Sequence, residues 1–113
     1  PLLPMVKADG YGLGAIAAAR ALEALEPWGY GVATLDEAAE LRASGIGRPL
    51  VTFMPLVPGS IPRCLALDVR PTIGDLEALR TWTAASRRRS MPPRARAADC
   101  ASRPASLNSQ RSR

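Results

Sequence analysis

The chain has 113 residues, of which 47% are hydrophobic and 22% are charged, and only five side chains are aromatic. This length suits one domain with a single core and excludes two domains of ordinary size. The formal net charge of +5 would, taken over the whole chain, suggest a protein that binds nucleic acid or another anionic surface.

The positive charge is confined to the C-terminal part of the chain. Residues 1–82 carry seven basic and nine acidic side chains, a net charge of −2, whereas residues 83–113 carry eight arginines and one aspartate, a net charge of +7. Residues 83–113 also contain no Phe, Trp, Tyr, Ile or Val. A segment with so little apolar surface cannot offset the entropy lost on ordering, so we expect a folded domain over 1–82 and a disordered basic tail over 83–113.

Apolar runs and cysteine spacing exclude further classes of protein. No apolar run approaches the roughly 20 residues that span a bilayer, and the N-terminus lacks the pattern of a secretory signal, so we expect a soluble, cytoplasmic protein with no membrane partner. Cys64 and Cys100 have no C-x-x-C spacing and the chain has no histidine, so no metal site is expected. The chain begins with Pro1 rather than Met, which suggests a piece of a longer protein.

Short apolar runs alternate with helical patterns along the predicted domain. Strands are expected over 2–7, 30–33, 50–54 and 69–73, and helices over 15–26, 35–43, 60–67 and 75–82. This alternation predicts an α/β fold with a parallel sheet and right-handed crossovers. Four βα units are half of a (β/α)₈ barrel, which needs about 250 residues, so we expect a partial TIM-type barrel followed by the tail.

Several single residues have structural interpretations. Thr34 and Glu37 have the spacing of a capping box at a helix start, and Gly45 is placed to end that helix in a left-handed conformation. Asp36, Glu37 and Glu40 are expected to form a solvated helix face with capping roles. Gly31 suggests a close approach of another group, and Cys64 is expected to be a small buried hydrophobic residue.

The tail has two interpretations beyond disorder. Its arginines would attract phosphates, but without aromatic residues for base stacking we expect no specific nucleic-acid binding. Its abrupt start near Thr83, within a strand–helix repeat, is what an out-of-frame translation of GC-rich DNA would produce. That hypothesis predicts that another frame of the same DNA resumes the strand and helix pattern.

Lys7 is the first candidate for chemistry, because it stands at the C-terminal end of the first predicted strand. In a βα barrel this end of the strands forms the mouth in which active sites lie. A neutral lysine amine in such a site is a nucleophile that forms a Schiff base with an aldehyde. From position alone, a lysine that ends a strand and reaches solvent is the favoured interpretation, because lysines are mostly exposed.

The sequence VKADGYGLG at residues 6–14, followed by WGYGVATLDEAAELRASGI at 28–46, resembles the N-terminal part of alanine racemases. These are pyridoxal-phosphate (PLP) enzymes with a barrel domain and a separate C-terminal β domain, and the resemblance covers roughly residues 3–82. It implies that Lys7 forms the internal aldimine with PLP and acts as one of two bases, and that Tyr11 contacts the cofactor phosphate. Gly10 and Leu13 depart from the family pattern, which has alanine and histidine there.

The resemblance implies a homodimeric enzyme that interconverts L-alanine and D-alanine and so supplies D-alanine for peptidoglycan. In the family the second base is a tyrosine from the C-terminal domain of the other subunit. Tyr11 and Tyr30 are the two tyrosines of this chain, and neither matches it. We therefore expect no racemase activity from this chain alone.

Two other functions fit parts of the same pattern. Other PLP-barrel proteins, namely amino-acid decarboxylases and PLP carriers, share the barrel lysine, although the glycine loop and the GVAT strand favour the racemase. Residues 10–15 also fit the G-x-G-x-x-A pattern of a dinucleotide-binding turn, with Asp36 beyond the next strand. That pattern is short and fits many loops by chance.

Overall fold

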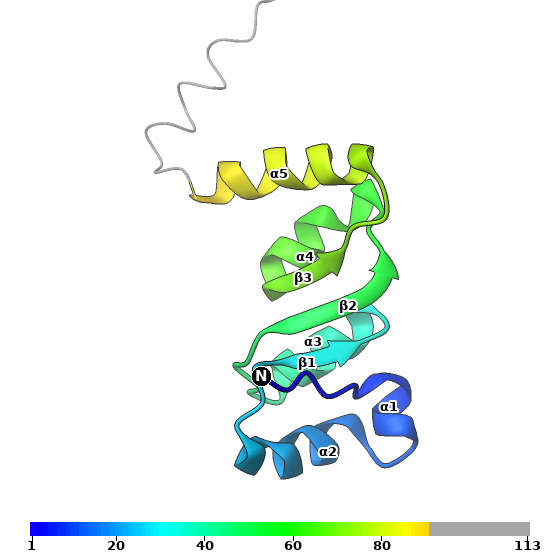
Figure 1. Ribbon diagram of the computed structural model, residues 1–113, viewed down its shortest axis with the longest axis vertical. Helices are drawn as coiled ribbons and strands as arrows, with labels where there is room; N and C mark the ends of the chain where they lie inside the picture. Colours follow the sequence, from blue (N-terminus) through cyan, green and yellow to red (C-terminus); the bar gives the residue numbers. More distant parts are fainter. Residues whose placement is uncertain (91–113) are drawn as a thin grey trace, which may run out of the picture.

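The computed structural model of the chain describes residues 1–90. These residues form a parallel sheet in which strands β1 (Tyr30–Val32), β2 (Leu50–Pro55) and β3 (Val69–Thr72) are neighbours in chain order (Figure 1). The helices are α1 (Lys7–Tyr11), α2 (Ala15–Leu22), α3 (Leu35–Ala43), α4 (Ile61–Leu67) and α5 (Leu76–Ser90), with 3₁₀ turns at Glu23–Leu25 and Pro58–Ser60. The predicted α/β class with a parallel sheet is confirmed.

The first predicted strand, over residues 2–7, is reduced to an isolated parallel bridge between Met5 and Gly31 beside β1. Gly31 N donates to Pro4 O at 2.8 Å and Val6 N donates to Gly31 O at 2.9 Å. The next rung of this ladder would need an N–H on Pro4, which proline does not have. On its N-terminal side the ladder therefore stops at Pro4. On its other side Val6 O accepts from Gly10 N and Ala33 N donates to Glu37 Oε2, and at Lys7 the chain turns into α1.

The C-terminal boundary of the folded part differs from the expectation. Helix α5 continues to Ser90, so residues 83–90, predicted to belong to a disordered tail, are helical. Trp82 and Ala85 of this helix pack against a buried cluster formed by Leu56, Ile61, Cys64 and Ala78. This long-range packing stabilises a segment whose composition alone suggested disorder. The rest of the predicted tail, residues 91–113, lies outside the described residues, and its out-of-frame origin stays a prediction.

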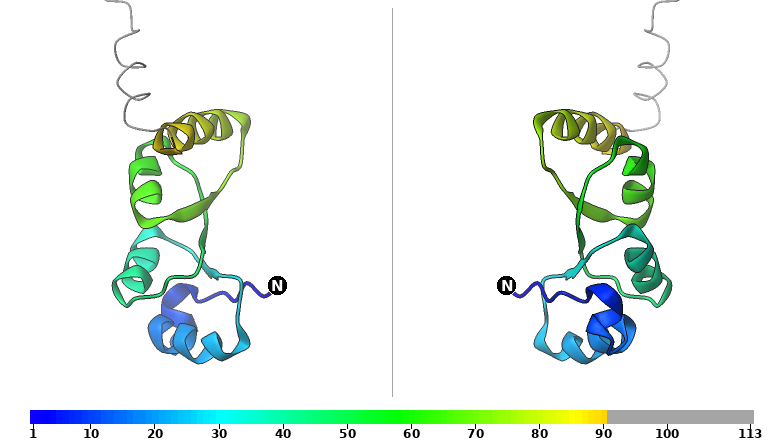
Figure 2. Two further views of the ribbon diagram at one scale, coloured as in Figure 1. Left: turned by 90° about the vertical axis from the view of Figure 1, so that its left-hand side faces the viewer. Right: turned by 90° about the vertical axis from the view of Figure 1, so that its right-hand side faces the viewer.

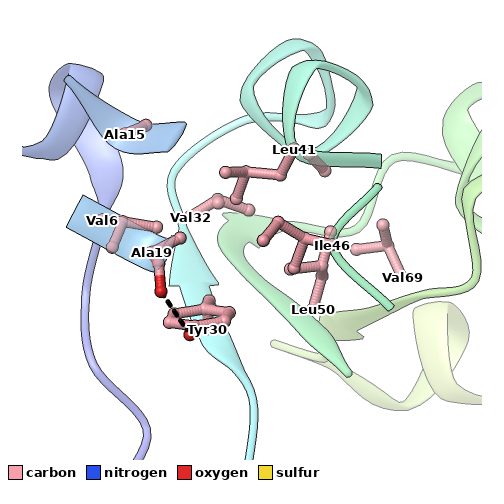
Figure 3. Packing of buried hydrophobic residues seen from close by; sticks show 10 residues of the cluster. Val6, Ala15, Ala19, Tyr30, Val32, Leu41, Ile46, Leu50 and Val69 are labelled. Atoms are coloured by element: carbon pink, nitrogen blue, oxygen red, sulfur yellow. Dashed lines mark hydrogen bonds between the residues drawn. The ribbon is translucent and has the colours of Figure 1, made fainter. Parts of the chain in front are cut away.

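Helices α3 and α4 lie on the same face of the sheet in both side views (Figure 2). The main core lies beneath that face and joins α2 and α3 to β1 and β2 through side chains such as Ala19, Leu41, Val32 and Leu50 (Figure 3). A doubly wound sheet would instead reverse its strand order at a switch point. The strands of this sheet are neighbours in chain order, and α3 and α4 cover one of its faces. This arrangement is consistent with part of a (β/α)₈ barrel.

The local interpretations of single residues hold where the structure tests them. Thr34 and Glu37 form a capping box at the start of α3, and Gly45 follows that helix with φ of 91°. The side chains of Met5 and Phe53 approach the Cα of Gly31 so closely that a Cβ there would overlap Met5 Sδ, in line with the close approach expected at this glycine. Cys64 is 1% exposed. Helix α2 is shorter than the predicted 15–26 because its last turn tightens into the 3₁₀ turn Glu23–Leu25.

A polar network crosses the end of the core opposite Lys7. The buried hydroxyl of Tyr30 lies 2.8 Å from Ala19 O and 2.7 Å from Glu23 Oε1, and Arg48 Nε donates to Glu23 Oε2 at 2.8 Å (Figure 3 shows the Ala19 contact). Burial, followed by the Glu23 carboxylate, raises the pKa of Tyr30 to about 12. The Arg48 guanidinium and the Tyr30 hydroxyl lower the pKa of Glu23.

We predict that ionisation of the Tyr30 hydroxyl lowers the free energy of unfolding in strong alkali. Its folded pKa of about 12 lies above the ordinary value of 10.0, so its contribution is fully present below pH 10 and is lost as the pH rises toward 12. Two pKa units correspond to about 2–3 kcal/mol. Urea unfolding at a series of pH values should show this loss in the natural chain and not in Tyr30→Phe. Equal slopes above pH 10 in both proteins would contradict the prediction.

Candidate functional site

Lys7 lies at the C-terminal end of the N-terminal segment, on the side of the sheet where β1 also ends. It borders an open cavity there. The cavity has a volume of about 430 Å³ and is lined by Met5, Lys7, Tyr11, Ala33, Phe53 and Met54. These residues come from the N-terminal segment, from the residue after β1, from β2 and from α1. Lys7 is the single lysine of the 113-residue sequence, so it supplies the only lysine amine that could react in this cavity.

The chain leaves Lys7 through a left-handed turn. Ala8, Asp9, Gly10 and Tyr11 have φ angles of 51°, 52°, 64° and 56°. Each residue other than glycine in this conformation costs about 1–2 kcal/mol, so the turn requires stabilising contacts. Backbone hydrogen bonds supply part of them: Gly10 N donates to Val6 O at 3.0 Å, Gly12 N to Ala8 O at 3.1 Å and Gly14 N to Asp9 O at 2.8 Å.

Two carboxylates anchor this turn to the neighbouring elements. Asp9 Oδ1 accepts a 2.8 Å hydrogen bond from Ala15 N at the first residue of α2. Glu37 Oε1 accepts a 2.9 Å hydrogen bond from Ala8 N. The carboxylates therefore tie the first two residues of the turn to their surroundings, Ala8 to α3 and Asp9 to the start of α2.

Lys7 and Tyr11, the two site residues expected from the sequence, lie side by side. Lys7 Nζ is 5.9 Å from the centre of the Tyr11 ring, within the range of a cation–π contact. Within residues 1–90 the Lys7 amine has no ion pair, and Tyr11 is 63% exposed. The arrangement presents one amine and one phenol, neither tied to another charged side chain, to a ligand that enters the cavity.

Glu37 and Asp9 were missed as residues of the site. The sequence predicts Glu37 as a cap on a solvated face, but its carboxylate also reaches Ala8, which is 29 residues away in the chain. Nothing in the local pattern signals this second partner, because it depends on how two parallel segments lie next to each other. For Asp9 a signal exists: Asp is among the residues that tolerate left-handed conformations, and it stands directly before the glycines.

The two departures from the family pattern disturb the turn little. Gly10 occupies a position with φ of 64°, which glycine adopts without strain. Leu13 is 81% exposed, so its side chain contributes nothing to the core. Neither residue takes part in the hydrogen bonds of Asp9 and Glu37 side chains with Ala15 and Ala8.

The dinucleotide-binding interpretation does not fit the geometry of the glycine loop. In that motif a pyrophosphate binds at the N-terminus of the helix that follows the glycines. Here the Asp9 carboxylate already accepts a hydrogen bond from Ala15 N at that position. The negative charge of Asp9 would repel a second anion. The N-terminus of α2 is therefore occupied by a side chain of the loop itself rather than open to a pyrophosphate.

Comparison with known proteins gives a single answer. A family model described as "Alanine racemase, N-terminal domain" matches residues 1–97. The alanine racemase of Geobacter sulfurreducens is 39% identical over 79 residues, which are 70% of this chain and 21% of that protein. The alanine racemase of Mycobacterium ulcerans is 39% identical over 87 residues, or 77% of this chain and 22% of that protein. The chain thus spans about a fifth of the length of these relatives.

Solved structures agree with the sequence comparison. The crystal structure of alanine racemase from E. faecalis matches with a TM-score of 0.68 and 34% identity, covering 73% of this chain and 22% of that one. Alanine racemase of Clostridium difficile 630 matches with a TM-score of 0.70 and 26% identity, covering 76% of this chain and 22% of that one. Within residues 1–90 no helix combines the length and the apolar character needed to cross a membrane.

We predict that Asp9 stabilises the fold through its hydrogen bond with Ala15 N. Asp9→Ala removes this cap and a side chain that tolerates the left-handed conformation, and should lower the free energy of unfolding by about 1–2 kcal/mol. Asp9→Asn keeps an acceptor oxygen and should stay within about 0.5 kcal/mol of the natural chain. Urea unfolding of the three proteins provides the measurement. If the alanine and asparagine variants are equally stable, the side-chain bond has no such role.

Proposed function

Because the chain belongs to the alanine racemase N-terminal domain family, we propose that it is the cofactor-lysine part of a PLP-dependent enzyme that interconverts L-alanine and D-alanine. The observation that carries this proposal is the single lysine, placed at the edge of the cavity with Tyr11 beside it. The same family membership supports a cytoplasmic homodimer that supplies D-alanine for peptidoglycan. In this proposal the bridged N-terminal segment and the three strands, each with the helix that follows it, are the first half of a (β/α)₈ barrel.

The residues around the cavity fit a cofactor of this kind. A volume of about 430 Å³ lies within the usual range of small-molecule sites, which are mostly apolar with a few polar groups. Met5, Phe53 and Met54 supply the apolar part, while Lys7 and Tyr11 supply the polar groups. Lys7 would hold the aldehyde carbon of PLP covalently, and Tyr11 would bind its phosphate through the phenol hydroxyl.

PLP supplies an electron sink that stabilises the negative charge left when a substrate loses its α-proton. The chain's own contribution is to hold the cofactor and to move a proton. When its amine is free, Lys7 Nζ can take a proton from the α-carbon of an amino acid in the cavity or return one to it. It reaches one face of that carbon.

A racemase needs a second base on the opposite face, and residues 1–90 offer no tyrosine suited to it. Tyr30 is fully buried, with its hydroxyl bound to Ala19 and Glu23. Tyr11 stands next to Lys7 on the same side of the cavity. The second base is therefore proposed to come from a part of the complete enzyme beyond this chain.

We predict that pyridoxal phosphate attaches to Lys7 of the 113-residue chain. Incubation with pyridoxal phosphate, followed by borohydride reduction and peptide mapping, should place the adduct on Lys7. Lys7→Arg keeps the positive charge and should carry no adduct at this position. Labelling of the N-terminal amine alone, in the natural chain, would contradict the cofactor role of Lys7.

We also predict that this chain alone does not racemise alanine. With Lys7 as its one candidate base, conversion of L-alanine to D-alanine in the presence of pyridoxal phosphate should stay at the level of free pyridoxal phosphate. Chiral chromatography of the alanine pool, with Lys7→Arg as the matched control, measures this directly. Conversion well above that of Lys7→Arg would mean that the chain holds both bases, and the proposed division of roles would fail.

A further inference from the structure

The carboxylate of Glu37 connects two neighbouring segments of the sheet at their C-terminal ends. Glu37 Oε1 accepts a hydrogen bond from Ala8 N at 2.9 Å, and Glu37 Oε2 accepts one from Ala33 N at 2.7 Å and a longer one from Thr34 N at 3.3 Å. Ala8 directly follows Lys7, and Ala33 directly follows the last residue of β1. One side chain on α3 thus contacts the residue after each of the two segments.

These contacts exceed what a helix cap needs. A capping box needs the bond between the Glu37 side chain and Thr34 N together with the bond from Glu37 N to Thr34 Oγ1, which is 3.2 Å. The two shortest bonds of the carboxylate go elsewhere, to Ala33 N and Ala8 N. Glu37 therefore has a role beyond capping α3, and its partner Ala8 directly follows Lys7, which lines the cavity.

The bond to Ala8 fixes the peptide group between Lys7 and Ala8. Ala8 is the first residue of the left-handed turn, with φ of 51°, a conformation that an alanine leaves readily when nothing holds it. The orientation of this peptide sets the direction in which the Lys7 side chain leaves the backbone. A reacting amine displaced by about 1 Å loses much of its rate, because attack on a bound carbonyl carbon requires close and aligned atoms.

We propose that Glu37 is a positioning residue for Lys7: by binding Ala8 N and Ala33 N together, it holds the lysine amine in line with the cavity. This inference rests on the proposed cofactor role of Lys7. It also requires a carboxylate rather than any polar side chain. All three partners are N–H donors, and an ionised carboxylate is acceptor-only, whereas a glutamine amide would turn an NH₂ group toward one of them.

The matched variants are Glu37→Gln and Glu40→Gln. Glu40 lies on the same helix and is exposed, so its substitution removes the same charge without touching Ala8. Glu37→Asp is a third variant, which keeps the charge at the start of α3 but is one methylene too short to reach Ala8 and Ala33 together. Circular dichroism and urea unfolding identify the variants that are folded under the labelling conditions.

The probe is pyridoxal phosphate alone, trapped on Lys7 with borohydride after timed intervals over a series of concentrations. In Glu37→Gln and Glu37→Asp the limiting rate of adduct formation should fall about fivefold to tenfold, the loss expected for one ordinary hydrogen bond. The half-saturating concentration should stay within about twofold, because Tyr11 and the apolar lining are unchanged. Glu40→Gln should match the natural chain in both quantities.

A second measurement reports the anchor without any cofactor. Amide hydrogen exchange at Ala8, followed by NMR, should be slow in the natural chain and in Glu40→Gln and at least about tenfold faster in both Glu37 variants. If Glu37→Gln is unfolded, Glu37→Asp carries the comparison.

The outcomes separate the two proposals. Labelling of Lys7 in the natural chain at a limiting rate equal to that of the folded Glu37 variants overturns the positioning role alone. A natural chain that is not labelled at Lys7 overturns the proposed cofactor role and the positioning role with it, and protection of Ala8 then describes a structural anchor only. A lower limiting rate together with faster exchange at Ala8 supports both.

Discussion

Four consecutive residues, Ala8 to Tyr11, adopt positive φ angles, and the candidate site depends on this left-handed turn. Only Gly10 among them takes the conformation without strain, so the turn persists because the surrounding structure fixes it. Val6 O, the Asp9 side chain and the Glu37 carboxylate supply the contacts. The turn places Tyr11 back beside Lys7 instead of letting the chain continue directly into α2.

The parallel sheet explains why one carboxylate can serve both helix α3 and the turn. Neighbouring parallel segments end at the same edge, and their following N–H groups point toward the helices that cover one face. Glu37 stands at the start of such a helix and accepts from Ala8 N and Ala33 N. The opposite end of the core has its own polar network around Tyr30. There the Tyr30 hydroxyl is hydrogen-bonded to Ala19 O and Glu23 Oε1, and Tyr30 does not line the cavity.

Local signals predicted much of this fold. The capping box at Thr34 and Glu37 and the left-handed Gly45 follow from residue spacing, and the order of strands follows from the alternation of elements. Three features depend on contacts that spacing does not reveal. Pro4 ends the first ladder because of the register it meets at Gly31, Trp82 extends α5 by packing on a distant cluster, and Glu37 reaches Ala8 across the sheet.

Lys7 and Tyr11 were predicted as a pair through the family resemblance, and the structure places them together at one cavity. The whole-chain charge of +5 has no part in this site, because the cavity lining holds a single charged side chain. The chain covers 21% of the Geobacter sulfurreducens relative. In the proposed function it would supply the lysine of a larger active site, and in the further proposal Glu37 would orient that lysine through Ala8 N.

The most direct test of this account is an NMR measurement of the backbone at Ala8, Asp9 and Tyr11 in the 113-residue chain. A positive φ brings the amide proton close to the α-proton of the same residue, so all three should show strong intraresidue NOEs between these protons. The right-handed residues of α3 supply the internal reference, with weaker intraresidue NOEs. Strong NOEs at the three positions are the predicted result. Intensities equal to those of α3 would contradict the left-handed turn and, with it, the placement of Lys7.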